Sequence, residues 1–520
     1  MRGSVNPGIS VAKTPGHTEP IEWAPTAITA FTGRARRGPV NKPVTVRGFA
    51  EFERIFGGLW GPSPLAYAVK DFFEYGGETA VIVRVVRGGR ATTIDLPAGK
   101  ETLRLRALYP GASEALRIAV DFDHITPSDT DLFNLTVQRV AAPGSALIED
   151  QEIFDRVSTL ANSGSFVKDR MMESHLVRVD GRVPLVRPNR TGNPMYGLPG
   201  SYVTSNADGD DGESITDEDL IGTGKSCTGI FALKNTQTFN LLCLPPLTRT
   251  RDVGNTAWRF AARFCEQRGA MLLVDAPAAW SSVEDVRNGI ERLGLKSANA
   301  ALYFPRLRQT DPLLGEPASF APCGVVAGII ARTDRKFGPW RAPAGDFARV
   351  RSHQRMACEF EPRDYACLAD ERVNCIRWFG AGKKSIASAY TLADPAGPVP
   401  EWRYLPGRRL ALFLRDSIRR GTEWAVFEPN TPGLWSRLRL QVGAFMHRCY
   451  MAGMFSGEIA SEACFVKCDG ETTTPADVAA GVVNVHVAFA PTSPGDFVEL
   501  KISQNVSNET GKRQTEQKTA

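Results

Sequence analysis

Five apolar segments between residues 238 and 304 decide the fold class of this chain. They are residues 238–244 (TFNLLCL), 253–267 (VGNTAWRFAARFCEQ), 271–275 (MLLVD), 282–293 (SVEDVRNGIERL) and 300–304 (AALYF). The three short runs are typical of buried strands, whereas the two longer segments repeat apolar residues at helical spacing. The order strand, helix, strand, helix, strand predicts a parallel sheet flanked by helices. We therefore expect residues 225–395 to form a central α/β domain.

A second set of apolar segments lies upstream, within residues 21–87. Residues 26–32 (TAITAFT) and 80–86 (AVIVRVV) are rich in β-branched side chains, which is typical of strands. Between them, residues 48–56 and 63–75 repeat apolar side chains at helical spacing. We expect these elements to form the N-terminal part of the core.

The sequence changes texture from residue 88 to residue 190, where short alternating stretches predominate. Examples are residues 102–107, 116–122, 133–137 and 175–179. Alternation of apolar and polar residues predicts half-buried strands, so we expect an inserted β-rich domain. Residues 191–224 include an acidic, glycine-rich run at 208–212 (DGDDG). We interpret residues 191–224 as a linker.

A C-terminal α+β domain is predicted over residues 396–502. Residues 408–420 and 434–451 have helical spacing, and Gly421 follows the first helix as a candidate C-terminal cap. Residues 482–489 and 496–502 alternate as strands do.

Two segments without a core-forming pattern flank these domains. They are an extended arm at residues 1–20 and a polar tail at residues 503–520. The predicted fold class is therefore multidomain α/β and α+β, with extended terminal arms.

The composition limits the classes of function. The chain has 520 residues and a net charge of +5, which is too small to indicate nucleic-acid binding by itself. No apolar run approaches the roughly 20 residues that span a bilayer. The first residues lack the apolar region of a signal peptide. We expect assembly in the cytoplasm, without membrane insertion.

The cysteines do not form a metal-binding pattern. All ten lie at or after Cys227, and no histidine accompanies Cys464 and Cys468 in sequence. We interpret them as small buried side chains of a reducing compartment.

An α/β domain invites a test for nucleotide binding. Residues 222–226 (GTGKS) and 380–385 (GAGKKS) resemble the end of a P-loop. Asp219 and Arg377 stand where the pattern requires its first glycine, and an acid there would also repel phosphate. We therefore expect no nucleotide site.

A hydrolase site has equally little support. His353 is the only histidine between His175 and His447, and it lies in a polar segment. Asp275 ends a predicted parallel strand, where active sites often lie, but we interpret it as a loop or capping carboxylate. We expect no catalytic residue, metal or cofactor.

Three blocks of short motifs follow one another along the chain. The first holds residues 20–33 (PIEWAPTAITAFTG), 49–58 (FAEFERIFGG) and 72–77 (FFEYGG). The second holds residues 301–305 (ALYFP), 324–334 (GVVAGIIARTD) and 338–345 (GPWRAPAG), and the third residues 421–430 (GTEWAVFEPN) and 465–469 (FVKCD). In this order, over roughly residues 20–90 and 225–502, they resemble the contractile tail sheath family. Its members form the outer cylinder of contractile phage tails, R-type bacteriocins and extracellular injection systems.

The resemblance implies a fold and a function. The central domain, 225–395, would be subtilisin-like in fold without being a protease, and the insertion would face outward. The chain would be a structural subunit, not an enzyme, that polymerises with copies of itself as hexameric rings stacked in a helix. Its other partners would be an inner tube protein and baseplate, terminator or cap proteins of a phage-like particle. Nucleic acid would not be a partner.

The resemblance also implies that terminal arms add strands to the sheets of neighbouring subunits. The candidate arm residues are Val5, Ile9, Val11, Phe497, Val498, Leu500 and Ile502. For the C-terminal group, pairing within its own domain is the alternative.

A helix of the C-terminal domain contacts an acidic inner tube in this family. The helix at 434–451 carries Arg437, Arg439 and Arg448, and no acidic residue occurs between Glu428 and Glu458. These arginines are the candidate tube-binding residues, and an ordinary solvated face is the alternative.

Two other functions compete with this reading. One is a hydrolase on the central α/β domain, and the other is a capping protein of the same machine that stops at one ring.

Overall fold

The chain divides into two units that interleave in sequence. The computed structural model describes residues 19–191, 202–379, 382–397, 399–492 and 497–506. In this part of the chain, the main unit holds residues 27–336 and 343–392, and the terminal unit holds residues 19–26, 337–342 and those from 393 onward. Residues 21–26 and 337–342 thus belong with the C-terminal region, and not with the N-terminal and central domains that the sequence predicted.

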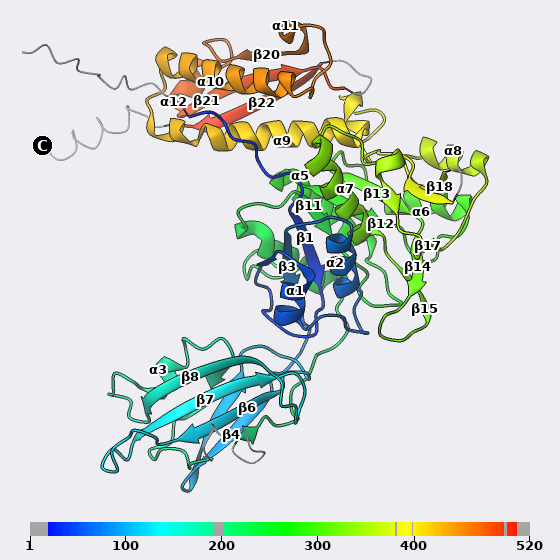
Figure 1. The fold of residues 1–520 in the computed structure, drawn as a ribbon. Coiled ribbons are helices and arrows are strands. Elements are labelled where there is room, and N and C mark those ends of the chain that lie inside the picture. The colour runs from blue at the N-terminus through cyan, green and yellow to red at the C-terminus, as the bar shows by residue number, and fades with distance from the viewer. Residues whose placement is uncertain (1–18, 192–201, 380–381, 398, 493–496, 507–520) are drawn as a thin grey trace, which may run out of the picture. The chain divides into compact units, whose positions relative to one another are not determined.

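A mixed sheet forms the centre of the main unit (Figure 1). Within the described residues its strands, in spatial order, are β16 (Arg349–Val350), β19 (Lys383–Ile386), β18 (Asn374–Phe379), β13 (Ala300–Phe304), β12 (Met271–Asp275), β11 (Leu241–Cys243), β1 (Thr29–Gly33), β3 (Ala80–Arg84) and β2 (Val44–Val46). The strands from β18 to β3 are parallel to one another. The predicted parallel sheet is therefore confirmed.

Helices cover both faces of this sheet, as the apolar strands require. Outside the insertion, the described α-helices of the main unit are α1 (Phe49–Phe56), α2 (Leu65–Glu74), α4 (Asp217–Ile221), α5 (Asn255–Arg268), α6 (Val283–Leu293), α7 (Cys323–Phe337) and α8 (Pro362–Asp370). On one face, Leu242 and Leu272 share a core with Trp258 of α5. On the other, Phe31 of β1 meets Phe72 of α2 edge to face at 5.6 Å. A small sheet of β14 (Leu307–Thr310), β15 (Pro317–Phe320) and β17 (Arg355–Met356) lies in the same unit.

The insertion contains two antiparallel sheets, which confirms its predicted β-rich character. One consists of β4 (Thr93–Ala98), β5 (Glu101–Ala107) and β9 (Val177–Val179), and the other of β10 (Val203–Thr204), β6 (Leu116–Asp121), β7 (Leu132–Val140) and β8 (Ile148–Ser158). Their inner faces and the short helix α3 (Val167–Arg170) share one apolar core.

The predicted linker is divided between two parts of the fold. Within residues 191–224, Val203 of β10 pairs with Ile118 of β6, so the insertion continues beyond residue 190. Asp217 of α4 accepts a hydrogen bond from the Gly254 amide at 2.9 Å, which ties α4 to the start of α5. Between these two elements, Asp210 and Glu213 form β-bridges with Arg90 and Arg87 at the start of the insertion.

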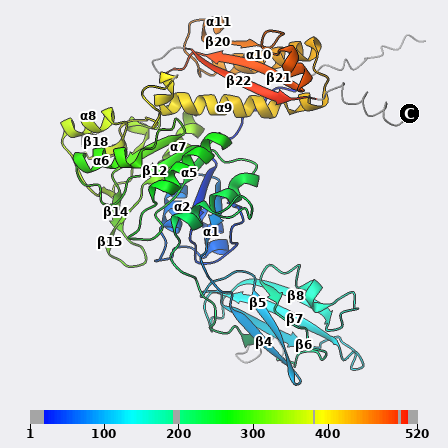
Figure 2. The same ribbon diagram turned by 180° about the vertical axis from the view of Figure 1, so that it is seen from behind.

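The terminal unit is built from two long helices and a three-stranded antiparallel sheet (Figure 2). Its elements are α9 (Leu405–Gly421), α10 (Pro432–Met451), α11 (Ala460–Ala463), β20 (Cys464–Lys467), α12 (Pro475–Ala479), β21 (Val482–Phe489) and β22 (Val498–Asn505). Alternate side chains of β21, such as Val485 and Val487, join Leu438 and Val442 of α10 in the core. The strand predicted at 496–502 extends to Asn505, into the predicted polar tail.

Helices α2 and α7 approach so closely that two glycines are required between them. A Cβ atom on Gly328 of α7 would lie 2.5 Å from Tyr75 Cβ and 2.6 Å from the Phe72 carbonyl oxygen. A Cβ on Gly324, one turn earlier, would overlap the Ala68 carbonyl. The glycines of the sequence GVVAG therefore give α7 a flat surface that fits against the backbone of α2.

We predict opposite effects for alanine at two helical glycines. Gly328→Ala should destabilise the chain by about 1–3 kcal/mol, because the added methyl group has no space. Gly443→Ala, on the surface of α10 with no atom near the new Cβ, should stabilise it by about 0.5–1 kcal/mol. Urea unfolding of both variants measures the difference. If Gly328→Ala is as stable as the unchanged chain, the described packing of α2 on α7 is wrong.

Candidate assembly surfaces

The N-terminal segment of residues 19–26 is fastened to the terminal unit by hydrogen bonds from α9 and α10. We name this segment and its contacts the N-terminal clamp. The Ala24 amide donates to the buried Ser417 Oγ at 3.0 Å, and Gln441 Nε2 donates to the Glu19 carbonyl at 2.7 Å. Arg409 Nη2 donates to the Thr26 carbonyl at 3.1 Å. Polar side chains of α9 and α10 thus form hydrogen bonds with backbone groups of a segment that is distant in sequence.

Apolar contacts complete the clamp. Ile21 is buried in the core of the terminal unit, and Trp23 packs edge to face on Phe413 and Trp340. A Cβ on Gly421 would lie 2.6–2.9 Å from three atoms of Ile21. Gly421 is the last residue of α9 and not a left-handed cap beyond it, so the predicted capping role is wrong. Its lack of a side chain makes room for Ile21.

The sequence contained a signal for the clamp that its interpretation missed. Ile21 and Trp23 lie on either side of Glu22 between Pro20 and Pro25, a pattern that suits an extended segment with one apolar edge. At helical spacing, Ser417 shares a face with Leu410 and Leu414, and a hydroxyl on such an apolar face needs a hydrogen-bond partner.

A groove of about 790 Å³ lies along the clamp within the terminal unit. Its walls include Trp23 and Pro25 of the clamp and Trp424, Glu428 and Arg437 from the region of α9 and α10. The predicted N-terminal arm residues Val5, Ile9 and Val11 lie outside the described residues. Their chain joins the clamp at Glu19, which lines this groove.

The predicted C-terminal arm is a strand of its own domain in this structure. β22 pairs with β21 over eight residues, from Val498 opposite Phe489 to Asn505 opposite Val482. Val498 and Ile502 are buried in the core, and Leu500 packs against it. This is the alternative that the sequence left open. Among the described residues, no strand pairs with the other edge of β22.

One aromatic pair stands at the surface of this sheet. Phe497, just before β22, is 48% exposed and lies 6.5 Å from the ring of Phe465 on β20, which is also exposed. Phe497 is thus the one predicted arm residue of the C-terminal group whose side chain is largely available to another molecule.

The three arginines of α10 do not form one basic face. Arg437 and Arg448 lie three turns apart on one side of the helix, and Arg439 lies about 200° from Arg437. Arg437 pairs with Glu428 at 3.2 Å and stacks over Trp424, and Arg448 donates to the Ile21 carbonyl. Two of the three arginines therefore have roles inside their own unit.

The centre of the exposed face of α10 is apolar. Leu440 is 75% exposed and Met451 72% exposed, and Ala444 and His447 lie between them at helical spacing. Arg439, on one flank of this face, is exposed and has no ion pair among the described residues.

Neither P-loop look-alike has the strand, loop and helix that phosphate binding requires. Residues 222–226 follow the helix α4 and precede a short 3-10 helix, Gly229–Asn235. In the described part of the second, residues 382–385, Gly382 precedes β19 and residues 383–385 belong to β19, which pairs antiparallel with β18. There Lys384 donates to the Ser352 carbonyl at 3.1 Å.

The residues considered for hydrolysis do not assemble into a site. Asp275 is buried at the end of β12, and burial raises the pKa of its carboxyl to about 7. His353 is exposed, and no group of metal-binding side chains occurs in the described ranges. In the same part of the chain, no helix is long and apolar enough to cross a membrane.

No protein-family model matches the chain, and no curated protein matches its sequence. Solved structures do match it over nearly its whole length. The sheath of PVC, an extracellular contractile injection system, in its contracted state is 16% identical, with a TM-score of 0.56, over 97% of this chain and 99% of that one. The contracted helical sheath of the anti-feeding prophage is 17% identical, with a TM-score of 0.56, over 97% and 100%. A sheath tail protein of Listeria innocua is 11% identical, with a TM-score of 0.64, over 94% and 97%.

The fold is that of contractile tail sheath proteins. The resemblance read from the motifs is confirmed at this level, and the coverage extends it to the insertion. The similar structures belong to structural proteins and not to enzymes.

Proposed function

We propose that this chain is the sheath subunit of a contractile, phage-like particle. It polymerises as hexameric rings stacked in a helix around an inner tube, and contraction of the cylinder drives the tube through a target envelope. The whole-length likeness to sheaths of contractile injection systems carries this proposal. A matched chain also occurs in the baseplate of the anti-feeding prophage, which supports a baseplate partner. A subtilisin-like topology of the main unit and assembly in the bacterial cytoplasm are parts of the proposal.

The clamp fixes the position at which the proposed N-terminal arm joins the terminal unit. Residues 1–18 precede Glu19 in sequence, and among the described residues no strand pairs with the outer edge of β22, where a strand of another copy would be added. Each backbone hydrogen bond of such a strand contributes about 0.5–1.5 kcal/mol, so many copies together make a strong lattice. A head-to-tail contact of this kind does not close on itself and therefore builds a filament.

We attribute contraction to rigid subunits that are joined to one another by their arms. In the proposed mechanism, subunits rotate as rigid bodies while the arms keep them connected. The extended cylinder is a kinetically trapped state, and the contracted one buries more surface between subunits. No nucleotide is needed, and the geometry of the P-loop look-alikes agrees with this.

Removal of the N-terminal arm tests the proposal. We expect the full chain to form long striated cylinders in electron micrographs, and a variant lacking residues 2–18 to remain as single particles. The matched control lacks residues 507–520 and keeps β22 whole, and we expect it to form cylinders. A strand deletion at 497–502 would instead damage the unit's own sheet.

Three results would overturn parts of this account. Normal cylinders from the variant without residues 2–18 would remove the role of the N-terminal arm. Single rings from the full chain would indicate a capping protein, and isolated particles under all conditions would contradict the sheath function.

For the inner tube, we propose that the exposed face of α10 makes the contact. The face offers apolar area at Leu440 and Met451 for an acidic tube, together with Arg439, which forms no ion pair within the part of the chain that the structure describes. Arg437 and Arg448 would add to the positive electrostatic potential near this face while they keep their contacts within the terminal unit.

Charge reversal at Arg439 tests this contact. Arg439→Glu should reduce co-sedimentation of the tube with the sheath, and more so at low than at high salt, because exposed pairs are screened. Sheath-only polymers should still form. Arg363→Glu, an exposed arginine of the main unit, is the control. Unchanged co-assembly of the Arg439→Glu chain would exclude this face of α10.

A further inference from the structure

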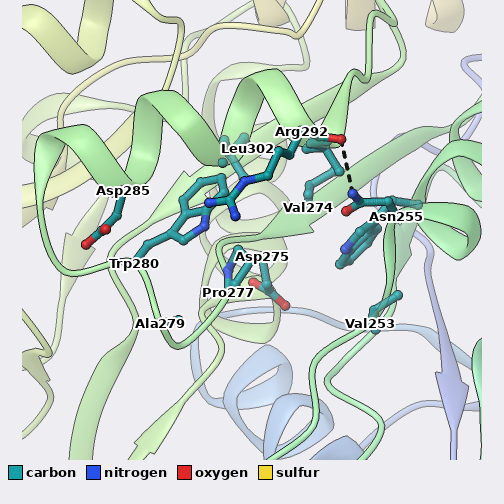
Figure 3. A pocket seen from close by; sticks show the side chains of 13 residues that line it. Val253, Asn255, Val274, Asp275, Pro277, Ala279, Trp280, Asp285, Arg292 and Leu302 are labelled. Atoms are coloured by element: carbon teal, nitrogen blue, oxygen red, sulfur yellow. Dashed lines mark hydrogen bonds between the residues drawn. The ribbon is translucent and has the colours of Figure 1, made fainter.

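A pocket of about 330 Å³ opens in the main unit where β12 ends (Figure 3). Arg292 lines this pocket and already supplies a positive charge there. Both carboxylate oxygens of Asp275 are buried, beside Cys323 at the start of α7. The pocket therefore leaves no accessible carboxylate of Asp275 for a ligand, and the surface of the terminal unit has a feature that carries further.

That feature is Phe427, which has the most exposed large apolar side chain in the described part of the chain. It ends the 3-10 helix η5 (Glu423–Phe427) of the terminal unit, and its side chain is 85% exposed. Val426 beside it is 38% exposed, whereas Ala425 of the same helix is buried. The helix thus turns one side into the unit and presents two adjacent apolar side chains to solvent. We name Val426 and Phe427 the apolar pair of η5.

The apolar pair lies close to a strand edge that has no partner among the described residues. η5 lies beside β22, and Gln504 Nε2 of β22 donates to the carbonyl of Thr422, just before η5, at 3.5 Å. β22 pairs with β21 on one side, and no described strand pairs with it on the other. Single exposed apolar side chains are common on protein surfaces. An aromatic ring beside an unpaired strand edge instead indicates a contact with another chain.

The charged groups around η5 are engaged within the terminal unit. Glu423 pairs with Arg419 at 3.5 Å, and Glu428 pairs with Arg437 at 3.2 Å. The surface therefore offers apolar area to a partner and not an unpaired charge. A segment that binds here needs an extended backbone and apolar side chains.

Of the two terminal segments that flank the described residues, one has such side chains. Residues 1–18 contain Val5, Ile9 and Val11 and no acidic residue, whereas residues 507–520 contain no large apolar residue. In a strand, Ile9 and Val11 would lie on the same face. Fully extended, residues 1–18 span roughly 60 Å, which is long enough to reach a neighbouring copy.

We propose that the apolar pair of η5 binds the N-terminal arm of another copy of this chain. The arm pairs with the open edge of β22, and Ile9 and Val11 pack on Phe427 and Val426. The proposal rests on the proposed sheath function and adds to it the side chains that recognise the arm. Backbone hydrogen bonds could hold any strand at this edge, whereas the side-chain contacts select the sequence of the arm.

A substitution at Phe427 tests the contact in assembly. In electron micrographs we expect the unchanged chain to form cylinders and the Phe427→Ser chain to remain as single particles, because the arm loses its aromatic contact. Leu185→Ser is the matched control, since Leu185 lies in the insertion and is 80% exposed, and it should form cylinders. Because both side chains are exposed, both variants should keep the melting temperature of the unchanged chain.

A peptide titration measures the same contact without cylinders. The probe is a fluorescein-labelled peptide of residues 1–18, added to the chain that lacks residues 2–18 and followed by fluorescence anisotropy. Phe427→Ser should weaken its binding at least about tenfold, as truncation of an aromatic anchor does, whereas Leu185→Ser should leave it unchanged. A peptide with Ile9→Ser and Val11→Ser should bind as weakly as the original peptide binds to the Phe427→Ser chain.

Three results would overturn the proposal. The first is equal affinity of the peptide for the Phe427→Ser chain. The second is equally tight binding of a peptide of residues 507–520. The third is normal cylinders from the Phe427→Ser chain, which would show that no other copy needs this contact. Failure of the unchanged chain to form cylinders would contradict the sheath function instead, and the peptide titration would still decide whether the apolar pair binds the arm.

Discussion

The rest of the structure depends on the N-terminal clamp, which holds residues 19–26 on helices near the other end of the chain. The hydrogen bond between Ala24 and Ser417 joins residues 393 positions apart. Closing so long a loop costs conformational entropy, and the burial of Ile21 together with several hydrogen bonds offsets that cost. As a result, both ends of the described chain belong to one unit. In the proposed polymer, this unit is where neighbouring copies would be linked.

The local pattern of the sequence predicted much of the fold. β-branched runs and helical periodicity identified β1, β3, β11, β12, β13, α5, α6, α10 and β21 within a few residues, because these elements are specified by neighbours in sequence. The parallel strand β18 was not predicted. The clamp was not predicted, since its partners lie hundreds of residues away. The same limit applied to α10. The sequence shows that Arg437 and Arg448 are basic, but only the fold shows that Arg437 pairs with Glu428 and that Arg448 donates to the Ile21 carbonyl.

The candidate sites, too, were predicted from the sequence only in part. The missing glycines of the P-loop look-alikes already argued against nucleotide binding, and the described residues of both segments lie outside any strand-to-helix turn. Asp275 was recognised at the end of its strand but interpreted as a loop or capping carboxylate. Its burial beside Cys323 of α7 follows from packing between segments far apart in the chain, which a sequence does not display. An α/β fold is thus compatible with the proposed structural role, in line with the general independence of fold and function.

Hydrogen exchange in residues 21–26 tests the clamp most directly. In the Gly421→Ala chain the added methyl group would displace Ile21, so these amides should exchange at least about tenfold faster than in the unchanged chain, since local opening becomes easier. Gly407→Ala is the control in the same helix, because its new Cβ would meet only an ordinary contact at 3.7 Å, and it should leave the exchange unchanged. Equal exchange in both variants would contradict the account, because the N-terminal segment would then not be held by α9.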